Sequence, residues 1–129
     1  MSRPDSYQPG TPSWVDLSSP DMDASASFYG QLFGWEARET GPAEETGGYR
    51  MFYKDDLPVA GLGPIMNEGQ PPAWTTYVTV TDADETTTKV TGAGGQPLMT
   101  PLDVMDVGRM GLYMDPAGAV IAVWQPGRH

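Results

Sequence analysis

The sequence predicts an α+β fold in which two tandem βαβββ modules form a curved mixed sheet around a central cleft. The length of 129 residues suits one ordinary domain, and 39% hydrophobic residues are enough to build a core. Sixteen glycines and 13 prolines indicate many turns, which favours short strands over long helices. The third observation is an internal repeat, because residues 21–34 align without gaps on residues 82–95.

The first copy predicts a strand, a helix and then about three strands. The apolar alternation of residues 14–18 is typical of a strand. Asp21 then provides a helix cap and Gly34 a helix stop. Further along, Asp55 marks a hairpin turn, and residues 59–64 form the last strand of the module.

The second copy repeats this order. Residues 74–80 read as a strand, Asp82 as the cap of a second helix and Gly95 as its end. Asp115 marks the second hairpin turn, and residues 121–126 form the last strand.

The repeat also predicts the domain organisation. We expect a flexible arm over residues 1–10 and a single domain over 11–129, with modules at about 11–66 and 72–126. Neither module can bury both faces of a small sheet alone, so the two sheets are expected to join edge to edge. The cleft between them is the expected ligand site.

Composition excludes several classes of function. The chain has no cysteine, and its single histidine is His129, which excludes disulfide scaffolds, thiol nucleophiles, Ser-His-Asp triads and multi-histidine metal sites. A net charge of −10 disfavours nucleic acid and anionic membranes as partners. The sequence contains neither a run of about 18 apolar residues nor a secretion signal, so we expect a cytoplasmic protein.

Strand alternation selects candidate ligand-binding residues. If valine and leucine face the helices, the opposite face carries aromatic, small and polar side chains suited to a flat, hydrophobic ligand. Methionines beside a proline-bounded loop extend this adaptable apolar surface. The predicted ligand-binding residues are Trp14, Asp16, Thr75, Tyr77, Met99, Met110, Tyr113, Ala122 and Trp124.

Several of these residues have a second interpretation. Trp14 and Trp124 are either pocket walls or core residues, and the methionines either flank the cleft or fill the core. Tyr77 and Tyr113 lie either in the pocket or on the sheet surface. Two roles remain open for Asp16. It is either a general base or ligand contact, or a structural residue that pairs with Arg50 or Arg109 or accepts hydrogen bonds from backbone amides.

Three motifs in this order resemble the vicinal oxygen chelate superfamily of glyoxalases, bleomycin-resistance proteins and extradiol dioxygenases. They are Asp21-Met-Asp-Ala-Ser-Ala-Ser-Phe-Tyr-Gly-Gln-Leu-Phe-Gly-Trp35, the second copy up to Gly92-Ala-Gly-Gly95, and Asp115-Pro-Ala-Gly-Ala-Val-Ile-Ala-Val-Trp-Gln-Pro126. The Phe-Gly-Trp and Trp-Gln-Pro segments resemble an actinobacterial branch of hydroxylase-like and drug-binding proteins. The resemblance implies the vicinal oxygen chelate fold.

The resemblance also implies where metal ligands would lie, on the first and last strand of each module. None of the residues found there is a histidine, glutamate or glutamine, so we expect neither metal nor cofactor. With a register uncertainty of one, these positions are Trp14, Ala60, Thr75 and Ala122, or alternatively Val15, Gly61, Trp74 and Val123.

The sequence thus predicts a metal-free protein that sequesters a planar aromatic or hydrophobic natural product, of the antibiotic self-resistance or carrier type. The alternative is a metal-independent enzyme, hydroxylase-like or ring-rearranging, acting on an aromatic polyketide-like substrate, with Asp16 as base and Tyr77 or Tyr113 as acid. A third possibility is a structural or interaction domain. Open sheet edges and the dimers of similar single-domain proteins predict a homodimer.

Overall fold

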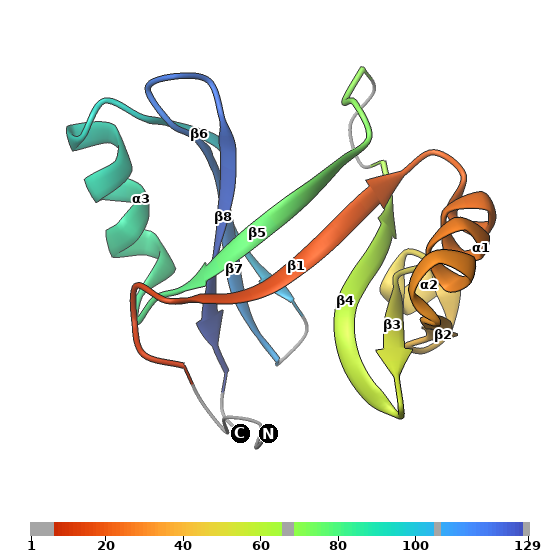
Figure 1. Cartoon of the computed structure of the whole chain (residues 1–129). Coiled ribbons are helices and arrows are strands. Elements are labelled where there is room, and N and C mark those ends of the chain that lie inside the picture. Colours follow the sequence, from red (N-terminus) through yellow and green to blue (C-terminus); the bar gives the residue numbers. More distant parts are fainter. Residues whose placement is uncertain (1–6, 66–68, 105–106, 128–129) are drawn as a thin grey trace. The chain divides into compact units, whose positions relative to one another are not determined.

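The computed structural model describes residues 7–65, 69–104 and 107–127, so the single histidine lies outside the described part. The chain divides into two compact units (Figure 1). Of the described residues, 14–65 and 69–75 form the first unit, and 7–13, 76–104 and 107–127 form the second. The elements are β1 (Pro12–Ser19), α1 (Met22–Phe33), β2 (Glu36–Glu39), α2 (Ala43–Thr46), β3 (Arg50–Lys54), β4 (Leu57–Pro64), β5 (Ala73–Thr79), α3 (Ala83–Gly92), β6 (Gln96–Val104), β7 (Gly108–Met114) and β8 (Val120–Pro126).

The first unit is a four-stranded mixed sheet in the order β2-β3-β4-β1. β1 and β4 run parallel, and the other neighbours are antiparallel. Helix α1 lies against one side of this sheet (Figure 1). The core between them consists of Leu17, Phe52, Ala60 and Leu62, against which Val15 also packs.

Helix α1 begins and ends where the sequence predicts. The side chain of Asp21 accepts a hydrogen bond from the Ala24 amide at 3.0 Å, which supplies a partner for one of the free N–H groups of the first turn. Gly34 ends the helix in the left-handed conformation with φ of 74°, and its amide bonds to the Gly30 carbonyl. Both predictions are confirmed.

The second unit repeats the arrangement with the order β5-β8-β7-β6. β5 and β8 run parallel, whereas β8, β7 and β6 are antiparallel. Ala83, Tyr113 and Val123 form its core together with Val80 and Val90. The Gly10 amide donates to the Thr79 carbonyl at 2.8 Å, which joins the end of the predicted N-terminal arm to this unit.

Helix α3 starts at the predicted cap but ends earlier than predicted. Asp82 accepts hydrogen bonds from the amides of Asp84 and Glu85. The helix stops at Gly92 because the amides of Ala93 and Gly95 both turn back to the Val90 carbonyl, and Gly94 takes a φ of 92°. The last helical residue is therefore three positions before Gly95.

Both predicted hairpin turns are present. Asp55 and Asp56 connect β3 and β4 with φ values of 52° and 64°, as a two-residue hairpin turn with two left-handed positions requires. In the second unit, Asp115 Oδ1 accepts from the amides of Ala117 and Ala119. The short helix α2 was not predicted, since four residues offer no periodicity to read.

The observed elements confirm the α+β class and the repeated order of strand, helix and three strands. In the described part of the chain, none of the helices has the length and apolar character needed to cross a membrane.

Candidate functional site

The predicted site residues divide between the two units, so each unit is described by itself. In the first unit, strand alternation places Val15 and Leu17 toward α1, as predicted, and Trp14 and Asp16 on the opposite face. Asp16 lies beside Gly61 in the parallel register of β1 and β4. The face away from α1 therefore carries an indole and a carboxylate next to a glycine.

Tyr49 joins this face and links the two predicted residues. The indole Nε1 of Trp14 donates a hydrogen bond to the Tyr49 hydroxyl at 3.2 Å. The same hydroxyl hydrogen-bonds the carboxylate of Asp16. A phenol that accepts from an indole and donates to a carboxylate has its proton directed at Asp16.

The electrostatics of this group follow from burial and from Asp16. Desolvation is the main reason why the pKa of Tyr49 lies well above its ordinary value of 10.0, and the charge of Asp16 and its hydrogen bond raise it further. The hydrogen bond from Trp14 acts in the opposite direction. Tyr49 is therefore a neutral hydrogen-bond donor at physiological pH.

Two glycines on β4 create the space that Tyr49 fills. A Cβ atom at Gly61 would overlap the Tyr49 hydroxyl and would lie 2.9 Å from the Asp16 Cβ. At Gly63, a Cβ would lie 3.3 Å from Cδ2 of the Tyr49 ring. The ring thus lies directly on the backbone of β4, which only glycine permits.

Sequence reasoning missed Tyr49. Its signal was the pair of glycines at alternate positions of β4, since glycines two residues apart on one strand face leave room for an aromatic ring. Tyr49 lies just before β3, whose neighbour is β4, and the turn that holds it there includes a bond from its amide to the Thr46 carbonyl. On β4, the position where the resemblance implies a metal ligand is Gly61, the alternative register, and not Ala60. Ala60 faces α1, whereas Gly61 lies beside Asp16.

The two arginines considered as partners of Asp16 bind other carboxylates. Arg50 pairs with Asp23 at 2.9 Å. Arg109 pairs with Asp84 at 3.0 Å and with Asp103 at 2.8 Å. The hydrogen bond from Tyr49 places Asp16 in a network with Tyr49 and Trp14.

In the second unit, the face away from α3 carries most of the remaining predicted residues. Tyr77 lies beside Ala122, and Met110 lies beside Trp124, in the registers of β8 with β5 and β7. A Cβ at Gly108 would overlap the Trp124 ring, which therefore lies against the backbone of β7. Tyr77 is 9% exposed and Ala122 is fully buried.

Tyr113 lies elsewhere. It is 2% exposed in the core beneath α3, and its hydroxyl shares a 2.8 Å hydrogen bond with Thr87 of that helix. The register of β7 explains this position. Gly111 pairs with Val123, which belongs to the core beneath α3, and Tyr113 lies two residues after Gly111, so its side chain points to the same side of the strand. Tyr113 therefore lies outside the candidate site, on the helix side of the sheet.

The two other predicted residues are peripheral. Met99 pairs with Leu112 between two irregularities of the β6–β7 register, and it borders a shallow hollow with Thr87 and residues 97–101. Thr75 is half-buried on β5, two positions before Tyr77.

The residues on these faces do not fit a metal site of transition-metal type. Asp16 lies beside Gly61, and the corresponding positions of the second unit carry Ala122 and Trp124, whereas such an ion needs several imidazole or carboxylate ligands. Across the described residues, no three His, Asp or Glu side chains gather closely enough to hold an ion.

The fold and these sheet faces define a class of protein. The family model described as the glyoxalase/bleomycin resistance protein/dioxygenase superfamily matches residues 11–123, and the chain belongs to this superfamily. Solved structures agree on the fold. A superfamily member from Vibrio splendidus 12B01 has a TM-score of 0.59 at 16% identity and covers 89% of this chain and 99% of its own. Methylmalonyl-CoA epimerase from Mycobacterium tuberculosis has a TM-score of 0.60 at 14% identity, with 93% and 90% covered.

More similar sequences come from actinobacteria. The anthracycline biosynthesis protein DnrV of Streptomyces peucetius is 43% identical over 135 residues, which cover 94% of this chain and 49% of DnrV. The putative glyoxylase CFP32 of Mycobacterium tuberculosis (strain CDC 1551 / Oshkosh) is 41% identical over 133 residues, which cover all of this chain and 51% of CFP32. The chain thus spans about half the length of the curated relatives it matches.

Proposed function

We propose that this chain is a metal-free binding protein that sequesters a planar aromatic natural product, as a self-resistance or carrier protein. The observation that carries the proposal is the position of Trp14, whose indole lies on the face away from α1 and is anchored at its N–H edge by Tyr49. An indole held at its edge keeps its ring in a defined orientation for stacking.

The second unit supports the same function. Trp124 lies on the face away from α3 with Met110 as its neighbour, and methionine adapts to apolar ligands of varied shape. Among the relatives, DnrV is named for anthracycline biosynthesis, and anthracyclines are built on a flat, fused ring system. A flat aromatic ligand therefore agrees with both the side chains and this relative.

The test is a calorimetric titration of the purified chain with an anthracycline as the probe. Trp14→Ala and Trp124→Ala are each expected to weaken binding about tenfold, because each removes a stacking surface and buried area. Trp74→Ala is the matched control, since Trp74 donates to Tyr29 and contacts the aromatic side chains around α1 instead. Unchanged affinity in both test variants would refute the site.

The Asp16–Tyr49 contact favours a second candidate function, a metal-independent enzyme acting on an aromatic polyketide-like substrate. In this alternative Asp16 is the base, and Tyr49, held beside it, takes the acid role that sequence reasoning gave to Tyr77 or Tyr113. The carboxylate of Asp16 is able to accept a proton from a substrate, and the neutral phenol of Tyr49 beside it is able to donate one.

Asp16→Asn separates the two functions. A binding protein is expected to lose about one hydrogen bond, on the order of 1 kcal/mol of affinity. An enzyme that uses Asp16 as base is expected to lose about a hundredfold or more in turnover, measured by chromatography of the polyketide after incubation. Anthracycline bound by the parent chain and recovered unchanged supports sequestration, whereas metal-independent conversion supports the enzyme.

A further inference from the structure

The hydrogen bonds on the face of the first unit away from α1 run in one direction. The indole N–H of Trp14 donates to the Tyr49 hydroxyl at 3.2 Å, and that hydroxyl donates its own proton to Asp16. An indole has one donor and a phenol has one, so both donors are used inside the network. A charged carboxylate only accepts, and it accepts more than one hydrogen bond. The network therefore presents an acceptor to a bound molecule.

This direction does not reverse at neutral pH. Burial, and then the charge of Asp16, place the pKa of Tyr49 well above its ordinary value of 10.0, so the phenol keeps its proton. The Tyr49 oxygen is already the acceptor for Trp14, which leaves its O–H to point at the carboxylate.

The spacing along β1 relates this acceptor to the indole. Trp14 and Asp16 are two residues apart, so their side chains share one face at a separation of about 6.5 Å along the strand. A ring stacked on the indole thus brings a short substituent to the carboxylate. Both side chains are half-buried, which leaves part of each at the surface. Gly61, the partner of Asp16 on β4, has no side chain to compete for the substituent.

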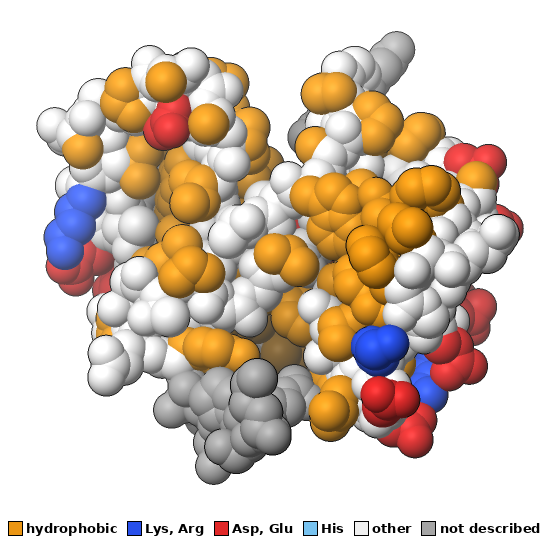
Figure 2. Space-filling view, in the orientation of Figure 1, with side chains coloured by type: hydrophobic (Ala, Val, Ile, Leu, Met, Phe, Trp, Pro, Cys, Tyr) orange, Lys and Arg blue, Asp and Glu red, His pale blue; other side chains and the backbone are white. Residues whose placement is uncertain are grey.

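We propose that the ligand of this site carries a hydrogen-bond donor on the edge of its aromatic ring, a hydroxyl or an amine, and that an anionic substituent there is excluded. The inference rests on the proposed binding of a planar aromatic compound and adds which substituent the site selects. The charge of the whole chain acts in the same direction, because a net charge of −10 repels anions. Figure 2 shows acidic side chains on the surface of both units.

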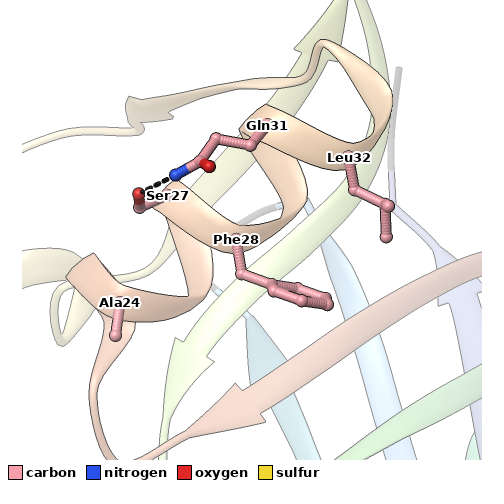
Figure 3. A pocket seen from close by; sticks show the side chains of 5 residues that line it. All are labelled: Ala24, Ser27, Phe28, Gln31 and Leu32. Carbon is pink, nitrogen blue, oxygen red and sulfur yellow. Dashed lines mark hydrogen bonds between the residues drawn. The ribbon is translucent and has the colours of Figure 1, made fainter.

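The hollow on helix α1 is a second place with exposed apolar side chains, and its chemistry is different. None of its lining side chains is charged, and its polar pair is joined by a 3.0 Å hydrogen bond from Gln31 Nε2 to Ser27 Oγ. A compound bound there would meet no carboxylate that selects a donor. The lining residues are Ala24, Ser27, Phe28, Gln31 and Leu32 (Figure 3).

The test compares three anthraquinones with a hydroxymethyl, a methoxymethyl or a carboxylate group at the same ring position. The first group donates a hydrogen bond, the second only accepts, and the third is an anion. In calorimetric titrations at neutral pH, the parent chain is expected to bind the hydroxymethyl compound about tenfold more tightly than the methoxymethyl compound, which leaves Asp16 without a donor. The carboxylate compound is expected to bind most weakly, because like charges meet.

Asp16→Asn is the decisive variant, because an amide donates as well as accepts. It is expected to reduce the preference for hydroxymethyl over methoxymethyl to less than about threefold and to raise the affinity for the carboxylate compound about tenfold. A misfolded variant would not show such a gain. Asp55→Asn is the matched control, since it removes the same charge from the exposed turn between β3 and β4, where asparagine tolerates the left-handed conformation. It is expected to keep the order of the three affinities.

Phe28→Ala tests the hollow on α1 and is expected to bind all three compounds as the parent chain does. An order of affinities that changes in Phe28→Ala but not in Asp16→Asn would overturn the inference. Equal binding of the three compounds by the parent chain would also overturn it, while the proposed binding function would stand. Binding of none of the three would refute the binding function itself, and this inference with it.

Discussion

Beneath α1 the fully buried aromatic ring is Phe52, whereas beneath α3 it is Tyr113. Phe52 needs no polar partner and is surrounded by apolar side chains and aromatic rings, including Trp35. Tyr113 brings a hydroxyl into the core, and Thr87 of α3 supplies its hydrogen bond. The same order of elements thus supports a buried ring without a polar group in one unit and a hydrogen-bonded ring in the other.

The outward surfaces of the two helices differ in the same sense as the buried rings beneath them. α1 exposes Phe28 and Leu32, whereas α3 exposes charged and hydroxyl groups. Threonine hydroxyls of α3 bond back to carbonyls one turn earlier, for instance Thr86 to Asp82 at 2.8 Å. The comparison teaches that a repeat can preserve topology while each copy distributes its polar groups differently.

The largest expected effect tests the apolar core of the first unit. Leu62→Ala is expected to cost about 2–5 kcal/mol of unfolding free energy, because Leu62 is fully buried and the change leaves a cavity. Leu57→Ala, in the same strand at 52% exposure, is the control and is expected to change stability by about 0.5 kcal/mol or less. Urea unfolding measures both, and equal losses would contradict this core assignment.

The next effect concerns the close contact of Tyr49 with β4. Gly61→Ala is expected to destabilise the chain by about 1–3 kcal/mol, because the new Cβ overlaps the Tyr49 hydroxyl. In a Tyr49→Ala background the same glycine substitution is expected to cost less, since the overlap with the hydroxyl is gone. Additive losses in the double variant would show that the two residues do not touch.

A smaller effect tests the polar core of the second unit. Tyr113→Phe keeps the ring but removes the bond to Thr87, and it is expected to cost about 1 kcal/mol of unfolding free energy. Thr87→Val removes the other hydroxyl of the pair. A double-mutant cycle between these substitutions is expected to give a coupling of about 0.5 kcal/mol or more, and zero coupling would argue against the bond.

The smallest expected effect on stability is the one caused by the titration of Tyr49, which is absent at neutral pH and develops only in alkaline solution. Its pKa in the folded chain lies above the ordinary value of 10.0, so the folded state holds this proton at pH values where the unfolded chain has lost it. This contribution to stability is complete below about pH 10 and declines as the pH rises above it. Denaturant unfolding between pH 9 and 11 measures it.

The parent chain is expected to lose more stability over this interval than Tyr49→Phe. Tyr7→Phe, which removes a tyrosine hydroxyl from a 41% exposed side chain, is the control and is expected to follow the parent. Parallel curves for the parent and Tyr49→Phe would show that Tyr49 is not held in its protonated form by folding.

The sequence by itself determined the features that depend on short-range interactions. The caps of Asp21 and Asp82 each need a side chain only two or three residues from the amides it binds, so local chemistry predicts them. Alternation placed Val15 and Leu17 toward the helix for the same reason, because neighbouring residues of a strand must point to opposite faces.

Only the tertiary structure decided which side chains meet on the faces away from the helices. The Trp14–Tyr49 bond joins residues 35 positions apart, and it depends on the register that sets β4, with its two glycines, beside β1. Tyr113 took the helix side because the pairing of β7 with β8 defines which of its residues face α3. A shift of one residue in a strand exchanges its two faces, and a pairing between distant strands leaves no local pattern that reveals its register.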